Sequence, residues 1–190
     1  SPRPPERWLD LCCGTGDLAL ALARKLRPDG SVLGLDAAEA PLTLAAERAS
    51  REPWLPVEWL QADALKTGLP DQTFDGLVMA YGLRNLADPF LGFQEMARLL
   101  KPGGRAAVLD FNRLPKGSVA AAFQRTYLRR VVVPVAAGMG LADQYAYLET
   151  SVEQFLTGEE QERQAVAAGF TAAQHRGLVG GQMGVLLLIR

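Results

Sequence analysis

The amino-acid sequence predicts an α/β protein built on a doubly wound, mostly parallel sheet of seven strands that closes in an antiparallel hairpin. Short apolar runs alternate with amphipathic runs between residues 8 and 111, the pattern of a parallel sheet covered by helices on both faces. Residues 171–178 and 182–189 then flank Gly180-Gly181, so the last strand is expected to run antiparallel to its neighbour. The 190 residues suffice for one well-packed domain.

The individual elements follow from apolar periodicity and from turn residues. We expect strands at residues 8–12, 31–35, 57–60, 74–80 and 105–111, and helices at residues 17–26, 41–51 and 89–100. The run Leu77-Val78-Met79 predicts that the fourth strand is buried on both faces. The Lys-Pro-Gly-Gly sequence of residues 101–104 predicts a tight turn before the fifth strand.

The C-terminal half departs from this alternation. Residues 118–130 predict a helix, whereas residues 131–139 are apolar but interrupted by a proline and a glycine. Thr157 and Glu160 have the spacing of a capping box, which predicts a helix that begins there and ends at Gly169.

Composition excludes several classes of protein. Hydrophobic residues make up 48% and charged residues 22% of the chain, which indicates a globular protein rather than a disordered one. The net charge of −1 argues against a general nucleic-acid binder, which would carry a basic excess. No apolar run has the length of a membrane span.

The cysteines and the single histidine predict no metal or redox chemistry. Cys12 and Cys13 are adjacent, and neighbours on a strand point to opposite faces, so we expect no bridge between them and a reduced environment. His175 lies on the predicted hairpin, where we expect a structural or exposed role. Because His, Cys and acidic residues do not cluster at ligand spacing, no metal site is expected.

The most informative stretch joins the first strand to the first helix. An apolar strand carries Asp10 near its end and is followed by Gly14-Thr15-Gly16, after which the helix begins at once. Gly14 and Gly16 allow the backbone to approach a ligand closely, and the N–H groups of the new helix point to the same place. An ordinary strand-to-helix turn is the alternative interpretation.

Acidic residues end the next two strands. Asp36 follows Gly16 by 36 − 16 = 20 residues, the spacing at which an acid hydrogen-bonds a ribose diol. Asp63-Ala64 follows the third strand and suits an adenine edge, because the acid accepts from the amine while the backbone N–H donates to a ring nitrogen. These residues predict an adenosine-binding cleft.

Both NAD(P) and S-adenosylmethionine fit this outline. Asp10 and Asp17 flank the glycine turn, and two carboxylates there would repel a pyrophosphate but suit a ligand with an ammonium and a sulfonium. The residues therefore favour S-adenosylmethionine, and an NAD-dependent oxidoreductase stays open as an alternative.

A resemblance to a known family covers nearly the whole chain. Residues 9–17 look like motif I of class I S-adenosylmethionine-dependent methyltransferases. Residues 74–88 and 95–104 resemble the quinone C-methyltransferases of menaquinone and ubiquinone biosynthesis, as do residues 145–155 and the closing hairpin. The resemblance implies a Rossmann-like methyltransferase fold and methyl transfer to a ring carbon of a prenylated quinol, with demethylmenaquinol as the expected substrate.

Other functions stay open beside this one. They are a benzoquinol precursor of ubiquinone as substrate, another small-molecule methyltransferase on the same fold, and a non-catalytic relative that only binds partners.

The resemblance also places functional residues. It implies cofactor contacts at Thr15, Asp36 and the pair Asp63-Ala64, and a further contact at Ala80, where some members of the family carry serine. Asp10, Gly14 and Gly16 complete the expected cofactor site.

Arg84 and Asn85 are the expected catalytic residues. A quinol ring carbon becomes nucleophilic when a hydroxyl loses its proton, and Arg84 with Asn85 would stabilise the resulting oxyanion. The proton acceptor is either a water held by these two residues or Asp110, which stands where the family usually has glutamate. A surface pair between Arg84 and Asp88 is the alternative interpretation. Tyr81 is expected to stack against the ring.

The resemblance extends to partners and location. The family has a helical segment ahead of motif I, which we expect this single-domain chain of residues 1–190 to lack. Residues 131–139 are expected to line the prenyl path and to contact a membrane surface transiently. We expect a cytoplasmic protein at the inner face of the membrane, and a homodimer stays open.

Overall fold

A single seven-stranded sheet organises the protein in a computed structural model that describes residues 2–114, 151, 152 and 154–190. Its strand order is β3-β2-β1-β4-β5-β7-β6. Every strand pair is parallel except the two that β7 makes with β5 and β6. The strands are β1 (Arg7–Leu11), β2 (Ser31–Asp36), β3 (Val57–Gln61), β4 (Phe74–Ala80), β5 (Leu100–Phe111), β6 (Ala172–Leu178) and β7 (Met183–Ile189). The predicted fold class is confirmed, including the closing hairpin.

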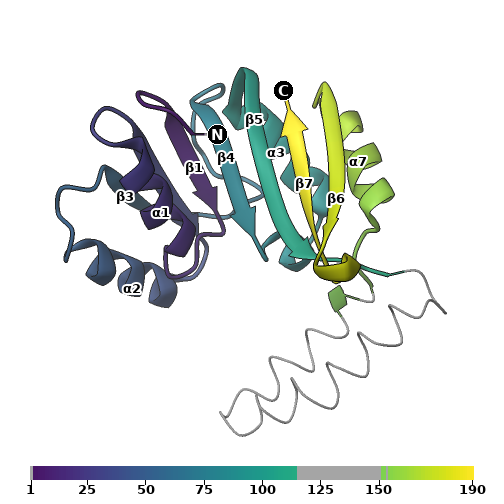
Figure 1. The fold of residues 1–190 in the computed structure, drawn as a ribbon, viewed down its shortest axis with the longest axis horizontal. Helices are drawn as coiled ribbons and strands as arrows, with labels where there is room; N and C mark the ends of the chain where they lie inside the picture. The colour runs from purple at the N-terminus through teal and green to yellow at the C-terminus, as the bar shows by residue number, and fades with distance from the viewer. Residues whose placement is uncertain (1, 115–150, 153) are drawn as a thin grey trace, which may run out of the picture.

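Helices cover the sheet from both sides. Helices α1 (Asp17–Leu26) and α2 (Glu39–Ala49) lie on one face, and α3 (Pro89–Leu99) and α7 (Gly158–Ala167) lie on the other (Figure 1). Two short 3-10 helices, η1 (Leu83–Asn85) and η3 (Val179–Gly181), complete the described elements. The chain order reverses between β1 and β4, and ligands of such sheets bind at the carboxyl ends of the strands beside this reversal.

The larger part of the core lies between the sheet and the α3–α7 face. Phe74, Phe93, Met96 and Leu100 are fully buried there. A smaller apolar cluster packs α1 against β1 and β2 around Trp8 and Leu26. Both clusters hold the sheet rigid, so the loops at the carboxyl edge are anchored on a fixed frame.

Local signals place most helix ends where the sequence predicts them. Helix α1 occupies residues 17–26, as predicted. Thr157 caps α7 through a complete capping box with Glu160. Gly169 follows α7 with φ +112°, a conformation that glycine adopts at little cost.

The fifth strand differs from its prediction. It begins at Leu100, which pairs with Phe74, and the register shifts before Gly76 pairs with Arg105. Residues 101–104 therefore form an irregularity within an extended strand rather than a turn before it, and Gly103 there has φ +76°. The Lys-Pro-Gly-Gly pattern marks a break in pairing in either case.

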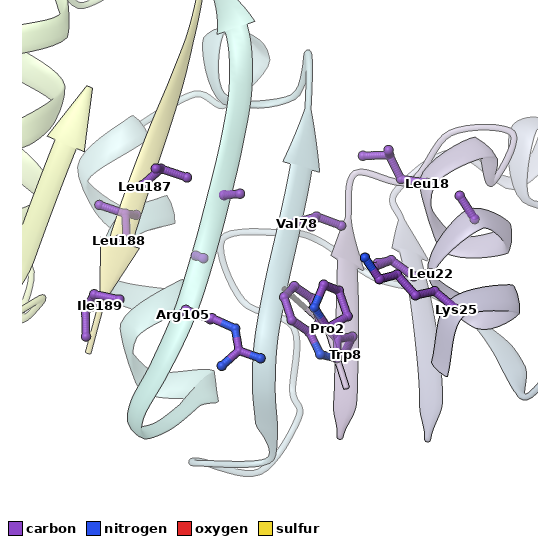
Figure 2. A pocket seen from close by; sticks show the side chains of 13 residues that line it. Pro2, Trp8, Leu18, Leu22, Lys25, Val78, Arg105, Leu187, Leu188 and Ile189 are labelled. Carbon is purple, nitrogen blue, oxygen red and sulfur yellow. The ribbon is translucent and has the colours of Figure 1, made fainter. Parts of the chain in front are cut away.

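The prediction that β4 is buried on both faces is wrong for one face. Leu77 and Met79 are buried, but Val78 is half-buried and lines an apolar groove of about 530 Å³. Figure 2 shows Leu18 and Leu22 of α1 on one side of this groove and Leu187 of β7 on the other. Of the described helices, only α1 contributes residues to the groove. Helix α1 packs mainly on β1, β2 and β3, so it leaves Val78 of β4 partly uncovered.

Several predictions lie outside the described residues. These are the helix at residues 118–130 and the apolar stretch at residues 131–139. Cys12 and Cys13 are both free thiols, as predicted. Among the described residues no helix is long and apolar enough to cross a membrane.

Candidate active site

The glycine loop follows β1 and enters α1 directly. Gly14 has φ +51° and Gly16 has φ +79°, conformations that side chains other than glycine adopt only with strain. A Cβ at Gly16 would lie 2.4 Å from Cη2 of Trp59, which packs across the loop. A Cβ at Gly14 would meet no atom within 4 Å. Gly16 is therefore required by packing, whereas Gly14 faces open space in which a ligand can lie.

Asp36 ties this loop to the end of β2. Its Oδ2 accepts a hydrogen bond from the Gly14 N–H at 2.8 Å, and its Oδ1 accepts one from the Ala38 N–H at 3.0 Å. Each carboxylate oxygen has a second lone pair. Asp36 can therefore hold the loop and still accept hydrogen bonds from a ribose diol.

A cleft of about 360 Å³ opens beside Asp36. Its walls come from the end of β2 and from the segments that follow β1, β2, β3 and β4. They are formed by Cys12, Asp36, Ala37, Asp63, Ala64, Leu65, Tyr81, Gly82, Asn85, Leu86 and Ala87. Asp63 Oδ1 accepts from the Leu65 N–H at 2.9 Å, which fixes the carboxylate at the cleft. The structure thus brings together four predicted site residues, Asp36, Asp63, Ala64 and Asn85.

The chemistry of the lining fits a cationic nucleoside. The described residues that line this cleft include two carboxylates and no basic side chain, so a pyrophosphate would meet repulsion while a sulfonium and an ammonium would be attracted. Burial, with Asp36 and Asp10 nearby, raises the pKa of the Cys12 thiol to about 12. Cys12 is therefore a neutral wall of the cleft at physiological pH.

Arg48 of α2 holds the other predicted loop residue. Its Nη1 donates to Thr15 O at 2.7 Å and to Thr15 Oγ1 at 3.2 Å, and its Nη2 pairs with Asp17 Oδ1 at 2.6 Å. The Arg48 hydrogen bond lowers the pKa of Asp17. Thr15 lies outside the residues that line the cleft, and its cofactor contact stays a prediction. No motif in the sequence indicated Arg48 or Trp59, because both reach the loop from other elements.

Asp10 is buried and does not line the cleft. Its Oδ2 is buried without a hydrogen-bond partner among the described residues. Burial, together with the nearby charges of Asp36 and Asp17, raises the pKa of Asp10 to about 7. A direct contact of Asp10 with the cofactor stays a prediction.

The loop after β4 carries the predicted catalytic pair. Tyr81 has φ +58°, and its carbonyl accepts hydrogen bonds from Arg84 Nη1 at 3.0 Å and from Asn85 Nδ2 at 2.9 Å. Arg84 pairs with Asp110 at 2.5 Å. Asp88 instead caps α3 by accepting from the Phe90 and Leu91 N–H groups, so the expected alternative of an Arg84–Asp88 pair is wrong.

A second cleft of about 300 Å³ lies on the other side of this loop. Arg84 lines it together with Pro89, Phe155 and Leu156 among others, and it shares Leu86 and Ala87 with the first cleft. Arg84 and Asn85 therefore lie on neighbouring clefts rather than side by side in one.

The remaining predicted residues lie at the edges of this region. Ala80 ends β4, is half-buried and lines neither cleft. His175 Nε2 lies 2.9 Å from Asn112 Oδ1, and burial lowers the pKa of His175, which agrees with a structural role. Among the described residues no group of His, Cys, Asp and Glu could hold a metal ion.

Alanine substitutions at Gly14 and Gly16 should affect ligand binding and folding stability to different extents. Gly14→Ala should lower the free energy of unfolding by about 1 kcal/mol, the cost of a left-handed alanine. It should weaken S-adenosylhomocysteine binding by about tenfold or more, because its methyl would enter the open space at Gly14 that we predict the cofactor to occupy. Gly16→Ala should cost about 2–5 kcal/mol, since the clash with Trp59 adds to the strain. Chemical denaturation and calorimetry check both, and unchanged binding by Gly14→Ala would contradict the placement.

The raised pKa of Asp10 predicts that the difference in stability between Asp10→Asn and wild type depends on pH. Because its folded pKa exceeds its unfolded value, the folded protein keeps a proton that the unfolded chain releases, and this group's contribution to stability decreases as pH rises from about 4 to about 7. The stability of Asp10→Asn relative to wild type should therefore increase by about 2–4 kcal/mol from pH 4 to pH 8. Denaturation at several pH values measures it, and a difference that does not vary with pH would mean that folding does not raise the pKa of Asp10.

Comparisons with known proteins identify the family of the chain. The model of the ubiE/COQ5 methyltransferase family matches residues 1–187. The chain is 43% identical over 187 residues to the 2-phytyl-1,4-naphtoquinone methyltransferase of Synechococcus elongatus, covering 98% of this chain and 80% of that protein. It is 44% identical over 185 residues to the chloroplastic 2-phytyl-1,4-beta-naphthoquinone methyltransferase of Arabidopsis thaliana, covering 96% of this chain and 70% of that protein.

Solved structures support the fold. A SAM-dependent methyltransferase from Aquifex aeolicus superposes with a TM-score of 0.73 at 18% identity, over 100% of this chain and 84% of that one. Phosphoethanolamine N-methyltransferase 2 of Haemonchus contortus, in complex with S-adenosyl-L-methionine, gives 0.76 at 15% identity, over 100% of this chain and 50% of that one. The chain therefore belongs to the ubiE/COQ5 methyltransferase family and is an S-adenosylmethionine-dependent methyltransferase.

Proposed function

We propose that this enzyme methylates a ring carbon of a prenylated 1,4-naphthoquinol, with 2-phytyl-1,4-naphthoquinol as the first substrate to test. The observation that carries the proposal is the pair of clefts that share Leu86 and Ala87, one lined by carboxylates and the other by Arg84 and apolar side chains. Relatives that match almost the whole chain are named as methyltransferases of 2-phytyl-1,4-naphthoquinone. Demethylmenaquinol differs from 2-phytyl-1,4-naphthoquinol only in its prenyl tail, and its methylation by this enzyme stays a prediction.

The cofactor belongs in the carboxylate-lined cleft. S-adenosylmethionine supplies an electrophilic methyl group on a positively charged sulfur. In this proposal Asp36 accepts from the ribose hydroxyls and the Asp63-Ala64 pair binds the adenine edge, supported by the free lone pairs of Asp36 and by the position of all three residues on one cleft. The open space at Gly14 lets the cofactor lie against the loop.

The quinol belongs on the Arg84 side of the shared wall. Loss of one hydroxyl proton places negative charge on the quinol oxygen and makes the ring carbon nucleophilic. The guanidinium of Arg84 stabilises that oxyanion by charge and by N–H donation. As the ring carbon bonds to the methyl carbon, the methyl–sulfur bond breaks and S-adenosylhomocysteine is the leaving group. The ring hydrogen then leaves as a proton, and reprotonation of the oxyanion restores the aromatic quinol. Phe155, Leu156 and Pro89 give this cleft an apolar surface for the ring.

The tail suggests where the enzyme works. A prenyl or phytyl chain is hydrocarbon and resides in a lipid bilayer, so we extend the proposal to transient contact with a membrane surface from the cytoplasmic side. A homodimer is compatible with this arrangement.

A direct assay tests the reaction. Purified enzyme with radiolabelled S-adenosylmethionine should methylate dithionite-reduced 2-phytyl-1,4-naphthoquinol, and multiprenyl naphthoquinol should also react. Prenylated benzoquinol should react at least about tenfold more slowly. The oxidised quinone should not react, because its ring carbon is not nucleophilic. Mass analysis identifies the product, and methylation of the benzoquinol alone would contradict the proposal.

Arg84 provides the second prediction of this proposal. Arg84→Gln should lower kcat by about 100-fold or more, the effect of losing an oxyanion donor, while S-adenosylhomocysteine binds within about threefold of wild type. Arg24→Gln, which removes an exposed pair with Glu52, serves as the matched control. If Arg84→Gln lost cofactor binding instead, Arg84 would belong to the cofactor site.

A further inference from the structure

Asp110 is a buried carboxylate at the carboxyl end of β5, with 3% of its surface exposed. Its Oδ1 accepts from Arg84 Nη1 at 2.5 Å and from the Phe111 N–H at 2.8 Å. Its Oδ2 accepts from the Arg84 backbone N–H at 3.1 Å. Both oxygens are therefore engaged, and Asp110 binds the side chain and the backbone of the same arginine.

The Arg84 guanidinium is fixed from several directions. Its side chain is 12% exposed, and its Cζ lies 5.6 Å from the Tyr81 ring centroid and 5.3 Å from that of Phe111. Nη1 also donates to the Tyr81 carbonyl. With Asp110 and two aromatic faces around it, the guanidinium has one orientation relative to the second cleft.

The same contacts fix the loop that separates the two clefts. Tyr81 N–H donates to Leu109 O of β5 at 2.8 Å, so β5 holds both ends of the turn from Tyr81 to Arg84. Asn85, which follows directly, lines the cofactor cleft. A buried ion pair is weak evidence for stability, because desolvation offsets its attraction, whereas fixed geometry at a reacting centre favours catalysis directly.

We propose that Asp110 is a positioning residue for the methyl transfer, which holds Arg84 toward the quinol oxygen and is not the proton acceptor. This inference rests on the proposed quinol methylation. Asp110 lines neither cleft, and a proton on its carboxylate would remove the negative charge that pairs with the Arg84 guanidinium. The proton then goes to a water beside Arg84 and Asn85.

Substitutions at Asp110 separate positioning from proton transfer. Asp110→Asn should lower kcat by about 10–100-fold, leave S-adenosylhomocysteine binding within about twofold, and keep the acid limb of the pH profile of kcat where it is in wild type. Asp110→Glu restores the charge on a longer chain and should recover at least about fivefold of the lost kcat. Asp71→Asn, which removes an exposed partner of Arg98, is the matched control and should behave as wild type.

A spectroscopic readout is independent of the substrate. In ¹⁵N NMR spectra the Arg84 Nε–H, which is buried without a partner among the described residues, should exchange slowly in wild type and rapidly in Asp110→Asn. Loss of the acid limb in Asp110→Asn would make Asp110 the base and overturn the inference. If Asp110→Asn kept the kcat of wild type and its Arg84 Nε–H exchanged as slowly as in wild type, the inference would be overturned as well. If wild type methylates no quinol, the proposed function fails, and the exchange data alone then decide whether Asp110 fixes Arg84.

Discussion

The carboxylate of Asp36 connects the two loops on which the cofactor cleft depends. It accepts N–H groups from the glycine loop after β1 and from the start of the segment that leads into α2. A parallel sheet brings the ends of β1 and β2 to one edge, and a short acidic side chain there can satisfy backbone donors from both. Asp36 and Ala37 themselves form part of the cleft wall, beside the loop that Asp36 holds.

Charge is distributed unevenly across the shared wall of the two clefts. Asp36 and Asp63 face the first cleft without basic neighbours in its lining, whereas Arg84 at the second cleft is paired with Asp110. The first arrangement attracts a cation, and the second presents a directed donor whose net charge is largely balanced. A methyl donor with positive charge and an acceptor that becomes anionic need these two environments side by side.

Sequence patterns predicted the fold well wherever the signal is local. The glycine turn, the limits of α1 and β4, the capping box at Thr157 and the hairpin all depend on neighbouring residues, and the structure agrees with each. Non-local features were out of reach. Arg48 lies 33 residues from Thr15, and Arg84 lies 26 residues from Asp110, so neither pair produces a periodic or adjacent pattern. The half-exposed Val78 shows the same limit, because its burial depends on where helices pack and not on its own strand.

A crystal structure of the enzyme with S-adenosylhomocysteine tests the central claim most directly, since that claim is a statement of position. The account predicts that the ribose hydroxyls lie within hydrogen-bond distance of Asp36, with the adenine at Asp63-Ala64 and the nucleoside over Gly14. A nucleoside bound outside this cleft, or one whose ribose contacts neither oxygen of Asp36, would contradict the account.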